Sequence, residues 1–152
     1  MANIKKREEQ TAVIEAEVVR ENINRALIQM PELISFDSLD PANEMLALMC
    51  SVGQGVPAHE RDGWRGTVVK WWFGPYTITD QKTGELITMP SLVLIPVEGE
   101  MCRLTGWPCV NTWVNILRHL GADRCRKGVA VKASLRASGV SGRDYWTVMP
   151  DA

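Results

Sequence analysis

Hydrophobic and polar positions alternate with the two-residue period of β-strands along several segments of the chain's second half. The first segment, residues 64–73, carries large apolar side chains at both odd and even positions. Strict alternation predicts two sets that point to opposite faces: Arg65, Thr67, Val69, Trp71 and Phe73, and Trp64, Gly66, Val68, Lys70 and Trp72. Such a strand is either buried on both faces or has an aromatic surface that binds a partner. Lys70 beside Trp72 favours binding for the second set.

Turn-forming residues divide the following stretch into further strands. Gly74-Pro75 is expected to turn or kink the chain before residues 76–80 continue as a strand. The glycine-containing turn 80–84 then leads into residues 85–90. Residues 91–97 form a continuous apolar run of strand length, which predicts a core strand.

The clearest hairpin lies in residues 128–149, where a turn at 137–142 joins two alternating segments. Its expected inward side chains are Val129, Val131, Ala133 and Leu135, and its expected outward side chains are Lys132, Ser134 and Arg136. The returning strand adds Arg143, Tyr145 and Trp146 near the turn. The hairpin therefore predicts an outer face on which cationic and aromatic groups lie together.

Three segments instead show the three- and four-residue spacing of amphipathic helices. The first covers about residues 11–29. The second follows Asp40, a typical N-cap residue, and Pro41, which suits the first helical position. The third begins near Pro108 and ends at Gly121. Its expected apolar face consists of Val110, Trp113, Val114, Leu117 and Leu120.

The length and composition of the chain fit one globular domain with a helical extension. The chain has 152 residues, of which 45% are hydrophobic. We predict a flexible tail at 1–10, a helical extension at 11–50, a glycine-rich linker at 51–63 and a mainly β domain at 64–152. The N-terminal helices offer no chemistry, so packing on the β domain or oligomerisation is their expected role. A detachable arm for protein partners is the alternative.

Charge and aromatic residues are distributed unevenly along the chain. Residues 1–60 carry five Lys/Arg and ten Asp/Glu, whereas residues 61–152 carry twelve and eight. From Cys102 onward there are eight Lys/Arg against three Asp. Nine of the ten Trp, Tyr and Phe residues lie within 63–150. This distribution favours an anionic partner for the second half, although solvated surface charge is an equal alternative.

The predicted elements within 63–149 follow the order strand, strand, strand, helix, strand, strand. In this order, and in the segments Gly128-Val-Ala-Val-Lys-Ala-Ser-Leu-Arg and Tyr145-Trp-Thr-Val, the chain resembles single-stranded DNA-binding proteins with the oligonucleotide/oligosaccharide-binding (OB) fold. The similarity is greatest to the divergent versions encoded by phages and mobile elements. It implies a five-stranded barrel with a helix between strands three and four, to which the chain adds an N-terminal helical extension. It also implies a role in DNA replication or recombination.

The resemblance and the residue pattern together predict a surface for single-stranded DNA, with RNA as an alternative ligand. The residues expected to contact phosphates are Lys70, Lys132, Arg136 and Arg143. Those expected to stack on bases are Trp72, Tyr76 and Tyr145 or Trp146. Each aromatic residue could equally fill the core of a small barrel. Because one small barrel holds only a short strand, we expect a homo-oligomer.

The sequence favours no enzymatic function, cofactor or metal. It contains no phosphate-binding loop, dinucleotide fingerprint, zinc-protease motif or nucleophile elbow. Cys50, Cys102, Cys109 and Cys125 include no CxxC pair, so we expect free buried thiols, with a Cys102–Cys109 bridge as the alternative.

Two further expectations concern location and partners. With no apolar run of bilayer length and no signal-peptide pattern, we expect a cytoplasmic protein without membrane contact. The main alternative to nucleic-acid binding is a non-catalytic protein-interaction module within a larger assembly, and oligosaccharide binding by the same face is a third interpretation.

Overall fold

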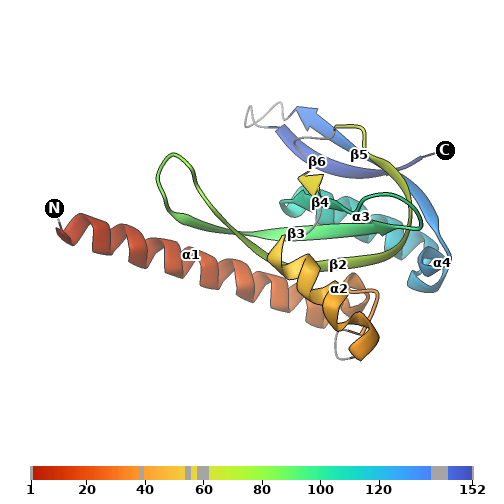
Figure 1. Cartoon of the computed structure of the whole chain (residues 1–152), viewed down its shortest axis with the longest axis horizontal. Coiled ribbons are helices and arrows are strands. Elements are labelled where there is room, and N and C mark those ends of the chain that lie inside the picture. The colour runs from red at the N-terminus through yellow and green to blue at the C-terminus, as the bar shows by residue number, and fades with distance from the viewer. Residues whose placement is uncertain (1, 38–39, 54–55, 58–61, 138–143, 152) are drawn as a thin grey trace.

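The computed structural model describes residues 2–37, 40–53, 56–57, 62–137 and 144–151 (Figure 1). Its helices are α1 (Ala2–Gln29), the 3₁₀ turn η1 (Pro31–Leu33), α2 (Pro41–Val52), α3 (Trp107–Leu120) and α4 (Ala122–Arg126). Its strands are β1 (Val56–Pro57), β2 (Arg65–Thr79), β3 (Leu86–Pro96), β4 (Cys102–Thr105), β5 (Val129–Ala137) and β6 (Asp144–Pro150). From β2 onward, three strands, a helical segment and two strands follow one another, in the predicted order. The bounds differ, because β3 covers both strands expected at 85–90 and 91–97, and β4 lies where no strand was expected.

The strands form one sheet in the order β1-β4-β3-β2-β5-β6. The five strands β2 to β6 pair antiparallel, and the two-residue β1 pairs with β4 in parallel. The long strand β2 pairs with β5 at its start and with β3 along most of its length. Within the described residues, no pairing joins the β4 edge to β6. The protein is therefore mainly β, with an open five-stranded antiparallel sheet accompanied by helices.

A β-bulge in β2 changes which side chains share a face. The pairing register with β3 shifts between Val68 and Lys70. A bulge inserts one extra residue and so reverses the alternation beyond it. As a result Trp64 and Val68 before the bulge, and Trp71 and Phe73 after it, all belong to one core. The strict alternation expected from the sequence is wrong for this strand.

The bulge also brings polar residues from both halves of β2 to the other side of the sheet. We call this side the outer face and the opposite side the core face. Arg65 and Thr67 lie on the outer face before the bulge, and Lys70, Trp72 and Tyr76 lie on it afterwards. Gly74 and Pro75 continue the strand without the turn expected there.

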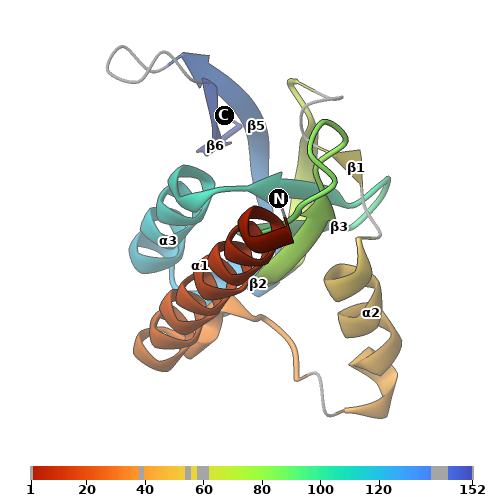
Figure 2. The ribbon, with the colours of Figure 1, turned by 90° about the vertical axis from the view of Figure 1, so that its left-hand side faces the viewer.

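Helices cover the two faces of the sheet unequally (Figure 2). The core face packs against α1 and α3, and its buried residues include Trp71, Leu104 and Trp113. The rings of Trp71 and Trp113 meet edge to face, with their centroids 5.2 Å apart. On the outer face, α2 covers a smaller cluster centred on Trp72 and Val93. The core position expected for Trp113 is confirmed.

The N-terminal helices agree with the sequence in part. Asp40 caps α2 as predicted, because its carboxylate accepts from the amide of Ala42 at 3.0 Å. The helix α1 begins at Ala2, well before the predicted start near residue 11, so residues 2–10 are helical where a tail is expected. Val56–Pro57 forms β1 within the expected linker. The division of the chain into functional units stays a prediction.

The four cysteines are free and buried, as expected. Burial raises the pKa of the Cys50 thiol to about 11, although nearby Arg103 opposes the shift. Burial also raises the pKa of Cys109 to about 12, and the pKa of Cys125 rises for the same reason. The thiols of Cys50, Cys109 and Cys125 are therefore protonated and unreactive near neutral pH.

Candidate nucleic-acid interface

The pairing of β2, β5 and β6 brings cationic side chains into neighbouring positions on the outer face. Arg65 lies opposite Lys132, and Arg136 lies four residues further along β5, on the same face. On β6, Tyr145 lies directly opposite Arg136. Arg65 and Arg136 are exposed, whereas Lys132 and Tyr145 are half-buried. These four residues form the surface that we call the hairpin face.

The other side of this hairpin belongs to the core. Val131 and Ala133 are fully buried and Val148 nearly so, in agreement with the predicted inward positions on β5. Leu135, predicted to face inward, is 39% exposed because it lies near the end of the hairpin. Trp146, one of the two expected stacking residues on β6, is only 8% exposed within the same core. Tyr145 is therefore the aromatic residue that β6 presents outward.

The hairpin face holds three cations, Arg65, Lys132 and Arg136, with several carboxylates at its border. Arg65 lines a pocket with Asp62, Glu98 and Glu100, and Asp62 accepts from the amide of Leu135 at 3.2 Å. The Nε of Arg65 lies 3.7 Å from Asp151, and its side chain is 67% exposed. Arg136 donates from Nη2 to the sulfur of Met149 at 2.8 Å, a neutral and weak acceptor. Both guanidinium groups can therefore exchange their present contacts for a phosphate at little cost.

A second group of expected site residues lies on the outer face near α2. Lys70 is exposed on β2, just past the bulge. Trp72 is 8% exposed and packs with Val93 and Cys50, so α2 covers its ring. Tyr76 is half-buried, and its ring centroid lies 4.1 Å from the guanidinium carbon of Arg103. Trp72 thus fills a core position, the alternative that the sequence left open.

Arg103 fastens α2 to this part of the sheet. Its Nη1 donates to Ser91 Oγ at 2.7 Å, and its Nη2 donates to the carbonyl oxygen of Cys50 near the end of α2. A cation at the C-terminal end of a helix is also favoured by the helix dipole. Burial lowers the pKa of Arg103, while Tyr76 and Cys50 oppose the shift. Arg103 therefore acts as an anchor beneath α2 and is not available to a ligand while α2 is docked.

Seven of the eight expected site residues lie in the described part of the chain, and they divide into three groups. Lys132, Arg136 and Tyr145 come together on the hairpin face, and Lys70 and Tyr76 lie on the same side of the sheet nearer to α2. Trp72 and Trp146 are core residues. Arg143 lies outside the described residues.

Sequence reasoning missed two cations, Arg65 and Arg103. Arg65 reaches the hairpin face only through the pairing of β2 with β5, which joins residues that are far apart in the chain. Only the strand order of the OB fold, which the sequence resembles, suggests that β2 pairs with β5. Arg103 follows Cys102 at the start of a four-residue strand that is too short to show a period, so nothing local indicated its burial.

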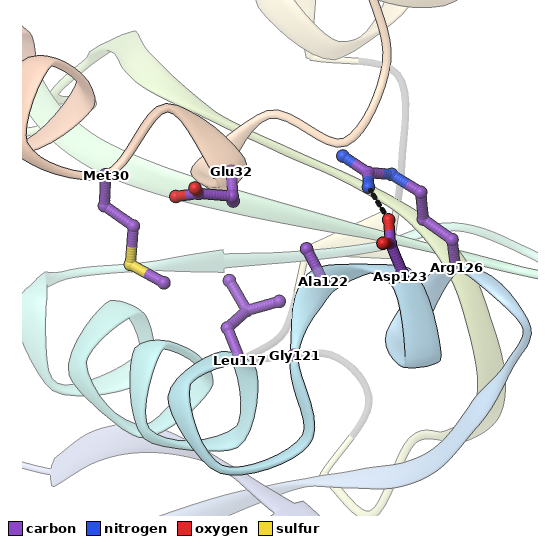
Figure 3. Close-up of a pocket in the computed structure, with 7 residues that line it drawn as sticks. All are labelled: Met30, Glu32, Leu117, Gly121, Ala122, Asp123 and Arg126. Atoms are coloured by element: carbon purple, nitrogen blue, oxygen red, sulfur yellow. Dashed lines mark hydrogen bonds and ion pairs between the residues drawn. The ribbon is translucent and has the colours of Figure 1, made fainter.

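A pocket between η1 and the α3–α4 corner is a weaker candidate for a binding site (Figure 3). It has a volume of about 460 Å³ and is lined by Met30, Glu32, Leu117, Gly121, Ala122, Asp123 and Arg126. Arg126, its cationic residue, already pairs with Asp123 at 2.9 Å and donates to the Ser35 carbonyl at 3.2 Å. The first bond lies within α4 and the second joins α4 to the segment just after η1, so the pocket is better explained as a gap between packed elements.

Comparison with protein-family models, with curated proteins and with solved structures gives no match. The interpretation of the hairpin face therefore depends on its own chemistry. The described part of the chain contains no group of three or more His, Cys, Asp or Glu residues that could hold a metal ion. Nor does any described helix have the length and apolarity needed to cross a bilayer.

Proposed function

We propose that this protein binds single-stranded nucleic acid, DNA in particular, on the hairpin face, without catalysing a reaction. The observation that carries the proposal is the row formed by Arg65, Lys132 and Arg136, with Tyr145 across from Arg136. Phosphates of a strand would meet the cations, and a base would stack on the tyrosine ring. Arginine can also stack on a base through its planar guanidinium.

The arrangement of strands supports an OB-like fold for this function. The long strand β2 pairs with both β3 and β5, and a helical segment separates β4 from β5. In a partly open OB barrel, the first strand is shared between two halves of the sheet in the same way. We propose that the open sheet corresponds to such a barrel, with the gap between β4 and β6.

The extent of the site follows from where α2 lies. The helix α2 covers Trp72 and binds Arg103. We therefore place the bound nucleic-acid strand along the part of the outer face that α2 leaves uncovered. Lys70, exposed beyond the bulge, extends the row of cations towards α2. With three to four phosphate contacts, single-stranded DNA binding should weaken with salt at a slope of about −2 to −3 in log K against log salt.

The test is a fluorescence anisotropy titration of a labelled oligo-dT at several salt concentrations. Since all tryptophans except the half-buried Trp107 are buried, the oligonucleotide must carry the label. We expect saturable binding with the slope given above, and weaker binding of a duplex of the same length. Tighter binding of oligo-rU than oligo-dT would assign the surface to RNA. Absence of binding at low salt, or binding that salt does not affect, would contradict the proposal.

A further inference from the structure

The helix α1 carries an exposed stripe on the side turned away from the sheet. The stripe consists of Ile14, Val18, Glu21, Arg25 and Ile28, with successive spacings of four, three, four and three. At 100° per residue these positions fall within about 80° of arc, directly opposite Ile23. Ile23 is 1% exposed in the core, which fixes the orientation of the helix. The stripe therefore faces solvent.

Three members of the stripe are large apolar residues that solvent reaches. Ile14, Val18 and Ile28 are 60%, 49% and 79% exposed. Single exposed apolar residues are common, but these three share one line with coiled-coil spacing: Ile14 and Val18 are one turn apart, and Ile28 follows beyond the charged positions 21 and 25. The helix is 28 residues long, and Figure 1 shows its N-terminal turns reaching past the tip of the β2–β3 hairpin. This length leaves a straight surface on which another helix can lie.

The charges within the stripe indicate which helix fits. In a parallel pair of α1 helices, Glu21 would face Glu21 and Arg25 would face Arg25, and both contacts are repulsive. In an antiparallel pair centred on residue 23, Glu21 faces Arg25 of the second copy, and Val18 faces Ile28 of the second copy. Two-fold symmetry makes each of these favourable contacts twice. The charge pattern therefore favours an antiparallel pair of α1 helices over a parallel pair.

We infer that two copies of this protein associate through antiparallel pairing of their α1 helices along this stripe. The two β domains then lie on opposite sides of the helix pair, because the stripe is opposite the face that packs on the sheet. The hairpin face lies on the outer side of the sheet, away from α1, and stays uncovered. This association is independent of nucleic-acid binding and does not require that the proposed function be correct.

The first test measures the mass of the native protein and of stripe variants by sedimentation velocity over a range of micromolar concentrations. We expect a reversible dimer, and a dissociation constant raised about 30-fold or more by Val18→Glu or Ile28→Glu, since each change places two charges in the seam. Arg20→Glu, at an exposed α1 position off the stripe, is the control. A native monomer throughout, or a dimer that the stripe variants do not weaken, would overturn the inference.

The second test fixes the direction of the pair by disulfide cross-linking. The four native cysteines are buried, so cysteines introduced on the stripe are the accessible thiols. Mixed Val18→Cys and Ile28→Cys proteins should give a cross-linked dimer under mild oxidation, whereas either variant alone should give little. Efficient cross-linking of Val18→Cys with itself would indicate a parallel pair and overturn the antiparallel arrangement.

Discussion

The guanidinium carbon of Arg103 lies 4.1 Å from the ring centroid of Tyr76, beneath the last turn of α2. The same guanidinium donates to Ser91 on β3 and to the Cys50 carbonyl of α2. One side chain from β4 therefore connects two neighbouring strands and a helix. Because the site is buried, loss of these contacts cannot be compensated by water.

Replacing Arg103 with alanine should lower the free energy of unfolding by about 2 to 4 kcal/mol, because it leaves a cavity and an unpaired buried hydroxyl and carbonyl. Urea denaturation followed by circular dichroism measures the change. Arg118→Ala, at an exposed position in the last turn of α3, should change it by less than about 0.5 kcal/mol. An effect of Arg103→Ala no larger than that of the control would mean that Arg103 does not hold α2 in place.

Gly74 is required by the ring of Trp72. A Cβ atom at position 74 would lie 2.4 Å from two atoms of that indole, closer than atoms can pack. Gly74→Ala should therefore displace Trp72 from beneath α2 and lower the free energy of unfolding by about 1 to 3 kcal/mol. Gly84→Ser is unsuitable as a control, because Gly84 has a positive φ of 73°. Combining Gly74→Ala with Trp72→Leu should recover part of the loss, and no recovery would contradict the steric explanation.

The sequence predicted the elements more reliably than their faces. The cap at Asp40, the helix around Trp113 and the last hairpin follow from local patterns, and the structure confirms them. The bulge after Val68 follows from pairing with β3, which no residue of β2 specifies alone. Once the bulge is known, the core positions of Trp64 and Trp71 both follow.

The candidate site was predictable to the extent that it lies within one hairpin. Lys132, Arg136 and Tyr145 share a face because of their positions in two adjacent strands. The burial of Trp72 depends on α2, and the contribution of Arg65 depends on pairing across more than sixty positions of the chain. Alternation within one strand carries no information about either.

Stability should fall as the solution becomes alkaline. The pKa of Cys109 rises from an ordinary value of 9.0 to about 12 through burial, so the native protein keeps a proton that the unfolded chain loses. The protonated thiol contributes its full share to the free energy of unfolding below pH 9. This contribution is lost between about pH 9 and 12, at about 1.4 kcal/mol per pH unit for each such thiol.

Urea denaturation at pH 7.5, 9 and 10 measures this dependence. Cys109→Ala should show a shallower decline above pH 9 than the native protein, since the two proteins differ only in this thiol. Equal slopes for the two proteins would contradict the assignment to Cys109.

Tyr145 should contribute to binding through its ring. Tyr145→Ala should weaken oligo-dT binding by about 5- to 100-fold, the usual range for loss of one base stack, whereas Tyr145→Phe should retain most of the affinity. Anisotropy titrations at one fixed salt concentration compare the three proteins. If phenylalanine weakens binding as much as alanine does, the hydroxyl group makes the contact and stacking is excluded.

The salt dependence of oligo-dT binding tests the hairpin face most directly. Lys132→Gln with Arg136→Gln removes two proposed phosphate contacts, and Arg118→Gln with Arg124→Gln removes the same charge from exposed positions on α3 and α4. We predict that the first pair reduces the steepness of log K against log salt by about 1.4 and weakens binding, while the second pair leaves the slope near its native value. An unchanged slope in the first pair, with the protein still folded, would contradict the assignment of nucleic-acid binding to this face.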